Sequence, residues 1–146
     1  MAEARIRPAK RPISIVRRPL SSILLPIPVV CFLGALLTDL TYANSSGNLV
    51  WLDFSSWLLA AGLALGAFAG LVLLIDAIRG AASWLQFGLL VVTFVVEFIN
   101  SLVHARDGWT AVVPLGLTLS IVGAILILLT GWLGQSVRYP VVGEAA

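Results

Sequence analysis

Charged residues are scarce in this sequence. Asp, Glu, Lys and Arg make up 11% of the 146 residues, whereas 60% are hydrophobic. Such a composition lies far outside that of soluble globular domains and indicates one small membrane domain. Cysteine and histidine are almost absent, with Cys31 and His104 as their only examples. A single cysteine excludes an intrachain disulfide and any CxxC-type zinc or iron–sulfur site.

Motifs for common chemistries are missing as well. The sequence has no Walker loop, no GxSxG, no HExxH and no dinucleotide fingerprint. A haem held by two histidines of one chain is not expected, because His104 is the only histidine. We therefore expect no enzyme, no metal site and no cofactor within a single chain.

The first 20 residues carry most of the positive charge. Six of the nine Lys and Arg residues stand there, before the first apolar run: Arg5, Arg7, Lys10, Arg11, Arg17 and Arg18. The segment also contains several prolines and no apolar period, so we expect a disordered basic tail over residues 1–20. It lacks interleaved aromatics, and a membrane span follows directly. Contact with anionic lipid is therefore expected rather than nucleic acid.

Four apolar runs are long enough to cross a bilayer as helices. Their expected bounds are about 23–42, 55–78, 84–104 and 110–133, within a transmembrane domain of residues 21–134. A cleaved signal peptide is the alternative for the first run, but that run exceeds the usual apolar core of such peptides and contains Asp39. The sequence thus predicts an all-α, four-helix membrane bundle, followed by a short tail over 135–146.

The distribution of Lys and Arg predicts the orientation of this bundle. If the N-terminus is cytoplasmic, eight of the nine basic residues lie inside and only Arg106 lies outside. The positive-inside rule then places both termini in the cytoplasm. We expect a multi-pass protein of the bacterial inner membrane.

The third run, 84–104, carries its polar residues on one face. At about 100° per residue, they fall within an arc of about 100°: Gln86, Thr93, Glu97, Asn100, Ser101 and His104. A polar face is costly in hydrocarbon unless it meets protein or water. We therefore expect this helix to present Glu97 and His104 to neighbouring helices or to a partner.

The predicted topology gathers polar residues at the outer surface. Glu97 lies about 10 Å deeper than His104 on the same helix face. Together the candidates would form a polar funnel that opens outward: Asp39, Glu97, Asn100, His104, Arg106 and Asp107. Such a funnel fits a proton path, a cation site or a quinone pocket. The alternative is that these side chains bond neighbouring helices without further function.

Small residues form a second pattern. Gly62, Gly66 and Gly70 follow one another at four-residue steps in the second run, which allows close helix packing. The fourth run is also rich in small residues: Pro114, Gly116, Ser120, Gly123 and Gly131. We expect Gly131 and Gly134 at its end to serve helix packing too.

Several segments together resemble the bacterial family catalogued as domain of unknown function 2231. The resemblance covers residues 18–139, and its more specific parts are Gly34-Ala-Leu-Leu-Thr-Asp39 and Gly131-Trp-Leu-Gly134. It implies a four-helix inner-membrane protein without an assigned activity. Many members carry His-Pro and Tyr-Arg-His-Gly where this chain has Arg18-Pro19 and Arg138-Tyr-Pro140. The candidate residues at matched positions are Asp39, Asp76, Asn100, His104, Arg106 and Asp107.

Three functions fit these patterns. The first is a non-enzymatic membrane subunit or scaffold whose funnel docks a redox or transport protein, as a homo-oligomer that adds packing to a small bundle. The second is a small proton-linked transporter or channel that uses Glu97 and His104. The third is a quinone- or haem-associated electron carrier with ligands from a second copy.

Overall fold

The computed structural model describes residues 19–106 and 112–135, and the helices in these ranges form one bundle. In chain order they are α1 (Ser21–Leu24), α2 (Pro26–Asn44), α3 (Leu49–Ile78), α4 (Trp84–His104), the short kinked segment η1 (Val112–Gly116) and α5 (Leu117–Gln135). Four helical stretches are long and apolar enough to cross a membrane: Ser21–Asn44, Leu49–Ile78, Trp84–His104 and Val112–Gly134. This confirms the predicted all-α, four-span architecture.

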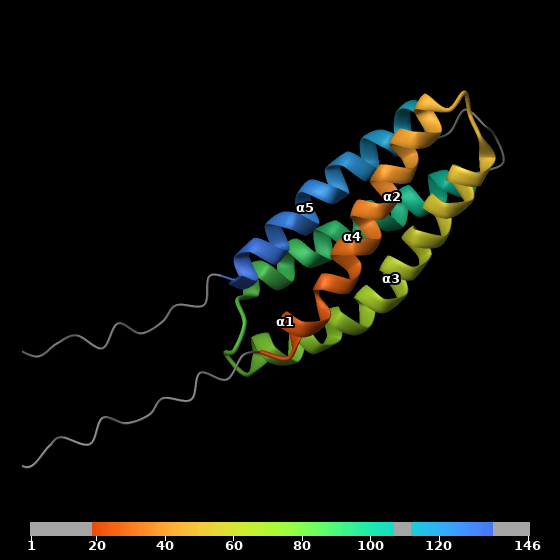
Figure 1. Cartoon of the computed structure of the whole chain (residues 1–146). Coiled ribbons are helices and arrows are strands. Elements are labelled where there is room, and N and C mark those ends of the chain that lie inside the picture. The colour runs from red at the N-terminus through yellow and green to blue at the C-terminus, as the bar shows by residue number, and fades with distance from the viewer. Residues whose placement is uncertain (1–18, 107–111, 136–146) are drawn as a thin grey trace, which may run out of the picture.

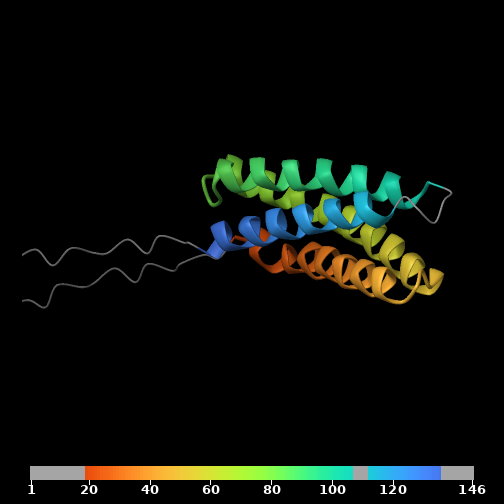
Figure 2. The same cartoon turned by 90° about the horizontal axis from the view of Figure 1, so that it is seen from above.

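The long helices lie side by side along one axis, and neighbours in sequence run in opposite directions (Figures 1 and 2). Both α2 and α4 pack against α3 and α5. Pro19 and Gln135 therefore lie at the same end of the bundle, called here the terminal end. The opposite end, where Ser45–Asn48 joins α2 to α3, is called the loop end. Which end faces the cytoplasm stays a prediction, as do the two tails, which lie outside the described residues.

Helix α4 has the predicted bounds, whereas α3 begins earlier than predicted. The loop expected over residues 43–54 is reduced to a turn, because α3 already begins at Leu49. Asn48 caps that helix through its side-chain oxygen, which accepts from the backbone N–H of Val50 at 3.1 Å. The apolar residues after the cap then extend the helix. The predicted span 55–78 was therefore six residues too short.

The N-terminal span is divided at Leu25. The short helix α1 comes first, and α2 starts with Pro26. Proline has no backbone N–H, but in the first turn of a helix this group would have no partner within the helix, so nothing is lost. Asp76 near the end of α3 accepts a hydrogen bond from the backbone N–H of Ser21 at 3.0 Å. This bond fastens α1 to α3 at the terminal end.

Glycines of α3 make room for aromatic rings in the core. A Cβ on Gly62 would stand 2.5 Å from Phe32, and one on Gly66 would stand 2.5 Å from Phe94. The two rings meet edge to face with centroids 6.2 Å apart. Gly62 and Gly66 thus serve packing as predicted, through rings rather than through a neighbouring backbone.

The remaining predicted packing glycines differ among themselves. A Cβ on Gly70 would be in ordinary contact with Leu90, at 3.5 Å, and one on Gly134 would overlap the side chain of Gln86. A Cβ on Gly131 would meet no described atom within 4 Å. The prediction that Gly131 serves helix packing is therefore wrong for the described bundle, because this position faces an open space.

Candidate functional site

The polar face of α4 is turned into the bundle. Its side chains are buried against the other helices: Gln86, Thr93, Glu97, Asn100 and His104. Two of them, Asn100 and His104, bond polar residues of the remaining helices near the loop end, and Glu97 is joined to them through Asn100. We call this group the buried polar network, and its members are Asp39 of α2, Ser55 of α3, Glu97, Asn100 and His104 of α4, and Ser120 of α5.

The network is centred on an ion pair between α2 and α4. His104 Nε2 lies 2.9 Å from Asp39 Oδ1, with both side chains fully buried. The same nitrogen lies 3.2 Å from Ser55 Oγ on α3. His104 Nδ1 lies 3.0 Å from the backbone carbonyl oxygen of Asn100.

These contacts indicate where the protons of His104 lie. A carbonyl oxygen can only accept, so Nδ1 must donate to Asn100. An ionised Asp39 can also only accept, so Nε2 must donate as well. With Asp39 ionised, both ring nitrogens carry protons, and the pair is an imidazolium beside a carboxylate. Burial of either charge alone would be costly, so each of the two residues stabilises the other in its charged form.

A second set of hydrogen bonds connects this pair to Glu97. Ser120 Oγ donates to Asp39 Oδ2. Asn100 Nδ2 donates to Ser120 Oγ at 2.8 Å and to Glu97 Oε2 at 3.1 Å. All four long helices are thereby joined through side chains near one end of the bundle.

Two atoms of the network have no partner among the described residues. These are Glu97 Oε1 and Asn100 Oδ1, both buried. Buried polar atoms without a partner are rare, since each forgoes the hydrogen bonds it would make in water. A proton on Glu97, a water molecule or a small cation would each remove this imbalance. The unpartnered carboxylate oxygen is thus the feature that packing alone does not explain.

Glycines of η1 and α5 provide the space that the network occupies. A Cβ on Gly123 would overlap the carboxyl group of Glu97, and one on Gly116 would lie 3.0 Å from His104 Cε1. Sequence reasoning missed Ser55, and it treated Gly116, Ser120 and Gly123 only as small packing residues. Their spacing of four and three residues puts them on one helix face. This shared face was the sequence feature from which a contact with the polar face of α4 could have been predicted.

The predicted candidates therefore separate into three groups. Asp39, Glu97, Asn100 and His104 come together and are at most 7% exposed. Arg106 is exposed and takes no part in the network, and Asp107 lies outside the described residues. The expectation of an open funnel is wrong for the four buried candidates, because their side chains bond one another and close the space between the helices.

The arrangement does not match a serine hydrolase. In a catalytic triad the acid binds one imidazole nitrogen and the serine binds the other. Here Asp39 and Ser55 both contact Nε2 of His104, while Nδ1 is engaged by a backbone carbonyl. Ser55 Oγ is in turn 3.5 Å from the carbonyl oxygen of Ala35, to which it donates. The geometry provides no base for a serine nucleophile.

Fold and site together define a multi-pass membrane protein with a buried, titratable network between its helices. The chain belongs to the family described as "Predicted membrane protein (DUF2231)", whose model matches residues 17–143. This confirms the resemblance seen in the sequence. No curated protein and no solved structure matches the chain.

Proposed function

We propose that this membrane protein is a small, non-enzymatic, proton-linked transporter in which Glu97 is the proton-binding residue. The supporting observation is the buried carboxyl group of Glu97, whose Oε1 has no partner among the described residues. An ionised carboxyl group at this depth costs about 2.5–3.5 kcal/mol on insertion scales. A residue that served only to join helices could be an amide without that cost.

The surroundings of Glu97 support a site that holds a proton in this conformation. Asn100 stands between Glu97 and the Asp39–His104 pair and donates to the carboxyl group. A side-chain amide does not readily pass a proton from one neighbour to the next, in contrast to a carboxyl or an imidazole. The network is therefore closed toward the loop end, and a proton reaches Glu97 when the helices there separate.

The other direction is closed as well. Towards the terminal end, Thr93 and Leu90 follow Glu97 on the same face of α4, and both are buried. Gln86 lies about 16 Å from Glu97 along the helix, from eleven residues at about 1.5 Å each. A Glu97 carboxyl group that is closed off from both ends of the bundle fits the occluded state of an alternating-access cycle.

Proton flux into vesicles tests this proposal. Purified protein is reconstituted with an entrapped pH dye, and a potassium gradient with valinomycin imposes the membrane potential. We expect proton uptake above that of empty vesicles, lost in Glu97→Gln. Thr93→Val is the matched control, because Thr93 lies one turn away on the same face and, among the described residues, its hydroxyl bonds only the carbonyl of Leu89. No flux through the wild type at either sign of the potential would contradict the proposal.

A second candidate is a membrane subunit or scaffold for a redox or transport protein, as a homo-oligomer. The observation in its favour is that the network joins all four helices, as polar residues do when they only stabilise a bundle. In that case Glu97→Gln would lower thermal stability and partner binding together. A stable, well-folded Glu97→Gln protein without flux would favour the transporter. Location in the bacterial inner membrane is part of both proposals.

A further inference from the structure

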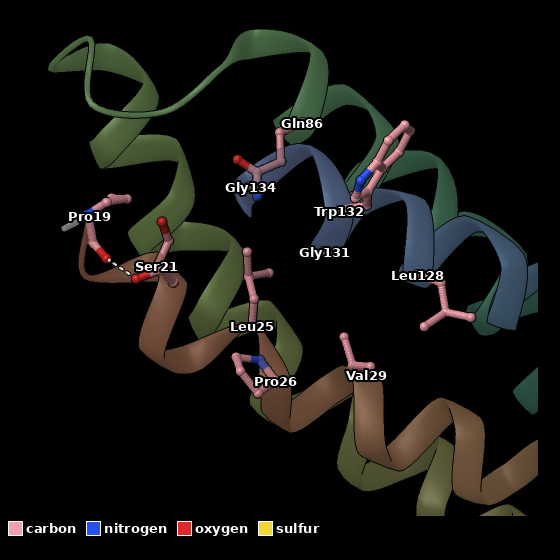
Figure 3. A pocket seen from close by; sticks show the side chains of 11 residues that line it. Pro19, Ser21, Leu25, Pro26, Val29, Gln86, Leu128, Gly131, Trp132 and Gly134 are labelled. Atoms are coloured by element: carbon pink, nitrogen blue, oxygen red, sulfur yellow. Dashed lines mark hydrogen bonds between the residues drawn. The ribbon is translucent and has the colours of Figure 1, made fainter. Parts of the chain in front are cut away.

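A cavity of about 340 Å³ lies at the terminal end, between α2 and α5 (Figure 3). Leu25 and Val29 form one wall, Leu128 and Gly131 form the other, and Gln86 of α4 closes the inner side. This volume is near the lower limit of ligand pockets, which span about 300–1,000 Å³. The cavity can hold one substituted ring but not a large ligand.

The open space follows from particular residues of α5. Gly131 and Gly134, from the segment Gly131-Trp-Leu-Gly134 that carries part of the family resemblance, both line it. A Cβ on Gly131 would meet no described atom, so a side chain here would project into free volume. Gly134 is the position against which the amide of Gln86 rests. Gly131 thus keeps the cavity open, whereas Gly134 makes room for the Gln86 side chain of α4.

The polar groups of the cavity are neutral. No Lys, Arg, His, Asp or Glu is among the described residues that line it. Gln86 Nε2 donates to the carbonyl oxygen of Thr130 at 3.2 Å. Ser21 and Gln86 are buried residues. Gln86 Oε1 and the hydroxyl of Ser21 make no hydrogen bond with a described residue, yet neither atom is fully enclosed, so a ligand in the cavity can reach them. Buried groups of this kind point to an uncharged ligand with oxygen atoms that can accept or donate.

The remaining lining is apolar and ring-compatible. Pro26 and Trp132 stand near its edges, and tryptophan prefers the boundary between hydrocarbon and head groups. Leu128 and Val29 continue the lining along α5 and α2 towards the middle of the bundle (Figure 3). The polar end of the cavity and its apolar lining along α2 and α5 together fit a ligand with a polar ring at this boundary and a hydrocarbon tail along the two helices.

We propose that the terminal-end cavity binds the head group of an isoprenoid quinone. A quinone is uncharged, flat and of one-ring size, and its oxygens accept in the oxidised form and donate in the reduced form. Ser21 and Gln86 can serve both forms, since a hydroxyl and an amide each donate and accept. A phospholipid fits less well, because its phosphate lacks a cationic partner among the described lining residues.

Binding is tested with decylubiquinone, a short-tailed quinone, and the full-length protein in phospholipid nanodiscs. Quenching of tryptophan fluorescence should saturate at one quinone per chain above the linear quenching caused by quinone in the lipid. Gly131→Leu fills the cavity and should weaken binding at least tenfold. Gly88→Leu is the matched control, because a Cβ on Gly88 also meets no described atom while Gly88 does not line the cavity. It should bind like the wild type.

A second variant keeps the volume and removes the polar partner. Gln86→Leu should weaken binding about tenfold, as expected for one lost hydrogen bond to a buried ligand. Quenching without saturation in the wild type would overturn the proposal, as would equal affinities of the Gly131→Leu and Gly88→Leu proteins. The proposal would also be overturned if native mass spectrometry found a bound phospholipid that decylubiquinone did not displace. None of these outcomes depends on proton flux.

Discussion

The two ends of the bundle differ in what their buried polar side chains contact: other side chains at one end, and a cavity at the other. Near the loop end, side chains from all four long helices bond one another, and Asp39 and His104 are buried among them. Near the terminal end, α2 and α5 leave a cavity whose polar groups, Gln86 and Ser21, have unused hydrogen-bonding capacity. Among the described residues, the buried side-chain atoms without a partner, Glu97 Oε1 and Asn100 Oδ1, belong to the network. The first end is filled by its own side chains and carries charge, whereas the cavity at the second is lined by neutral described residues and has room for a ligand.

Glycines of α5 show the same contrast. Gly123 is in direct contact with the carboxyl group of Glu97, whereas Gly131, two turns further, faces open space. One glycine is required because its neighbour already occupies the volume of a side chain. The other keeps a volume free. Two glycines in one apolar helix therefore predict opposite responses to substitution.

The largest effect is expected from breaking the ion pair. Asp39→Asn leaves a buried imidazolium without its counter-charge, and loss of one partner of a buried pair costs about 3–5 kcal/mol. Denaturant titration of the detergent-solubilised protein measures the loss. The double variant Asp39→Asn/His104→Gln removes both charges and should recover part of it, so that its loss of stability is smaller than the sum of the two single losses. Strict additivity would contradict the pairing.

A smaller loss is expected from crowding the network. Gly123→Ala places a methyl group in the volume of the Glu97 carboxyl group, and such overpacking costs about 1–3 kcal/mol. Gly88→Ala, with open space around it, should gain up to about 1 kcal/mol from helix propensity instead. Thermal unfolding of the two variants compares them directly. The Glu97→Ala background should relieve the crowding, and an unchanged loss there would show that another contact causes it.

The smallest effect concerns the turn at the loop end. Asn48→Ala removes the side chain that caps α3 and should lower stability by about 1 kcal/mol. Asn48→Ser keeps a capping oxygen and should be close to the wild type. Helix content by circular dichroism together with thermal unfolding checks both variants. Equal losses of stability in the two variants would show that packing, and not the cap, determines where α3 begins.

The sequence predicted the helices better than the contacts between them. Helix α4 has its predicted bounds because Ser83, whose side chain accepts from the N–H of Leu85, precedes a continuous apolar run. The start of α3 was missed, since a single asparagine decides whether Leu49–Phe54 continues the loop or begins the helix. Apolar pattern identifies a span, but a local cap determines its end.

The candidate site was predicted in part for a similar reason. The polar face of α4 is a property of one helix, so Glu97, Asn100 and His104 could be recognised from their spacing. Ser55 and Ser120 each stand alone in an apolar helix, and only the packing of four helices shows which serine meets His104 or Asn100. The closure of the predicted funnel and the space beside Gly131 are likewise results of packing between helices.

The most direct measurement is infrared spectroscopy of the carboxyl groups while the pH of the reconstituted protein is changed. If Glu97 binds and releases the proton, one protonated-carboxyl band should change with pH, disappear in Glu97→Gln and persist in Thr93→Val. A band that is unchanged in Glu97→Gln, or a wild type without any pH-dependent carboxyl band, would contradict the assignment of Glu97 as the proton-binding residue.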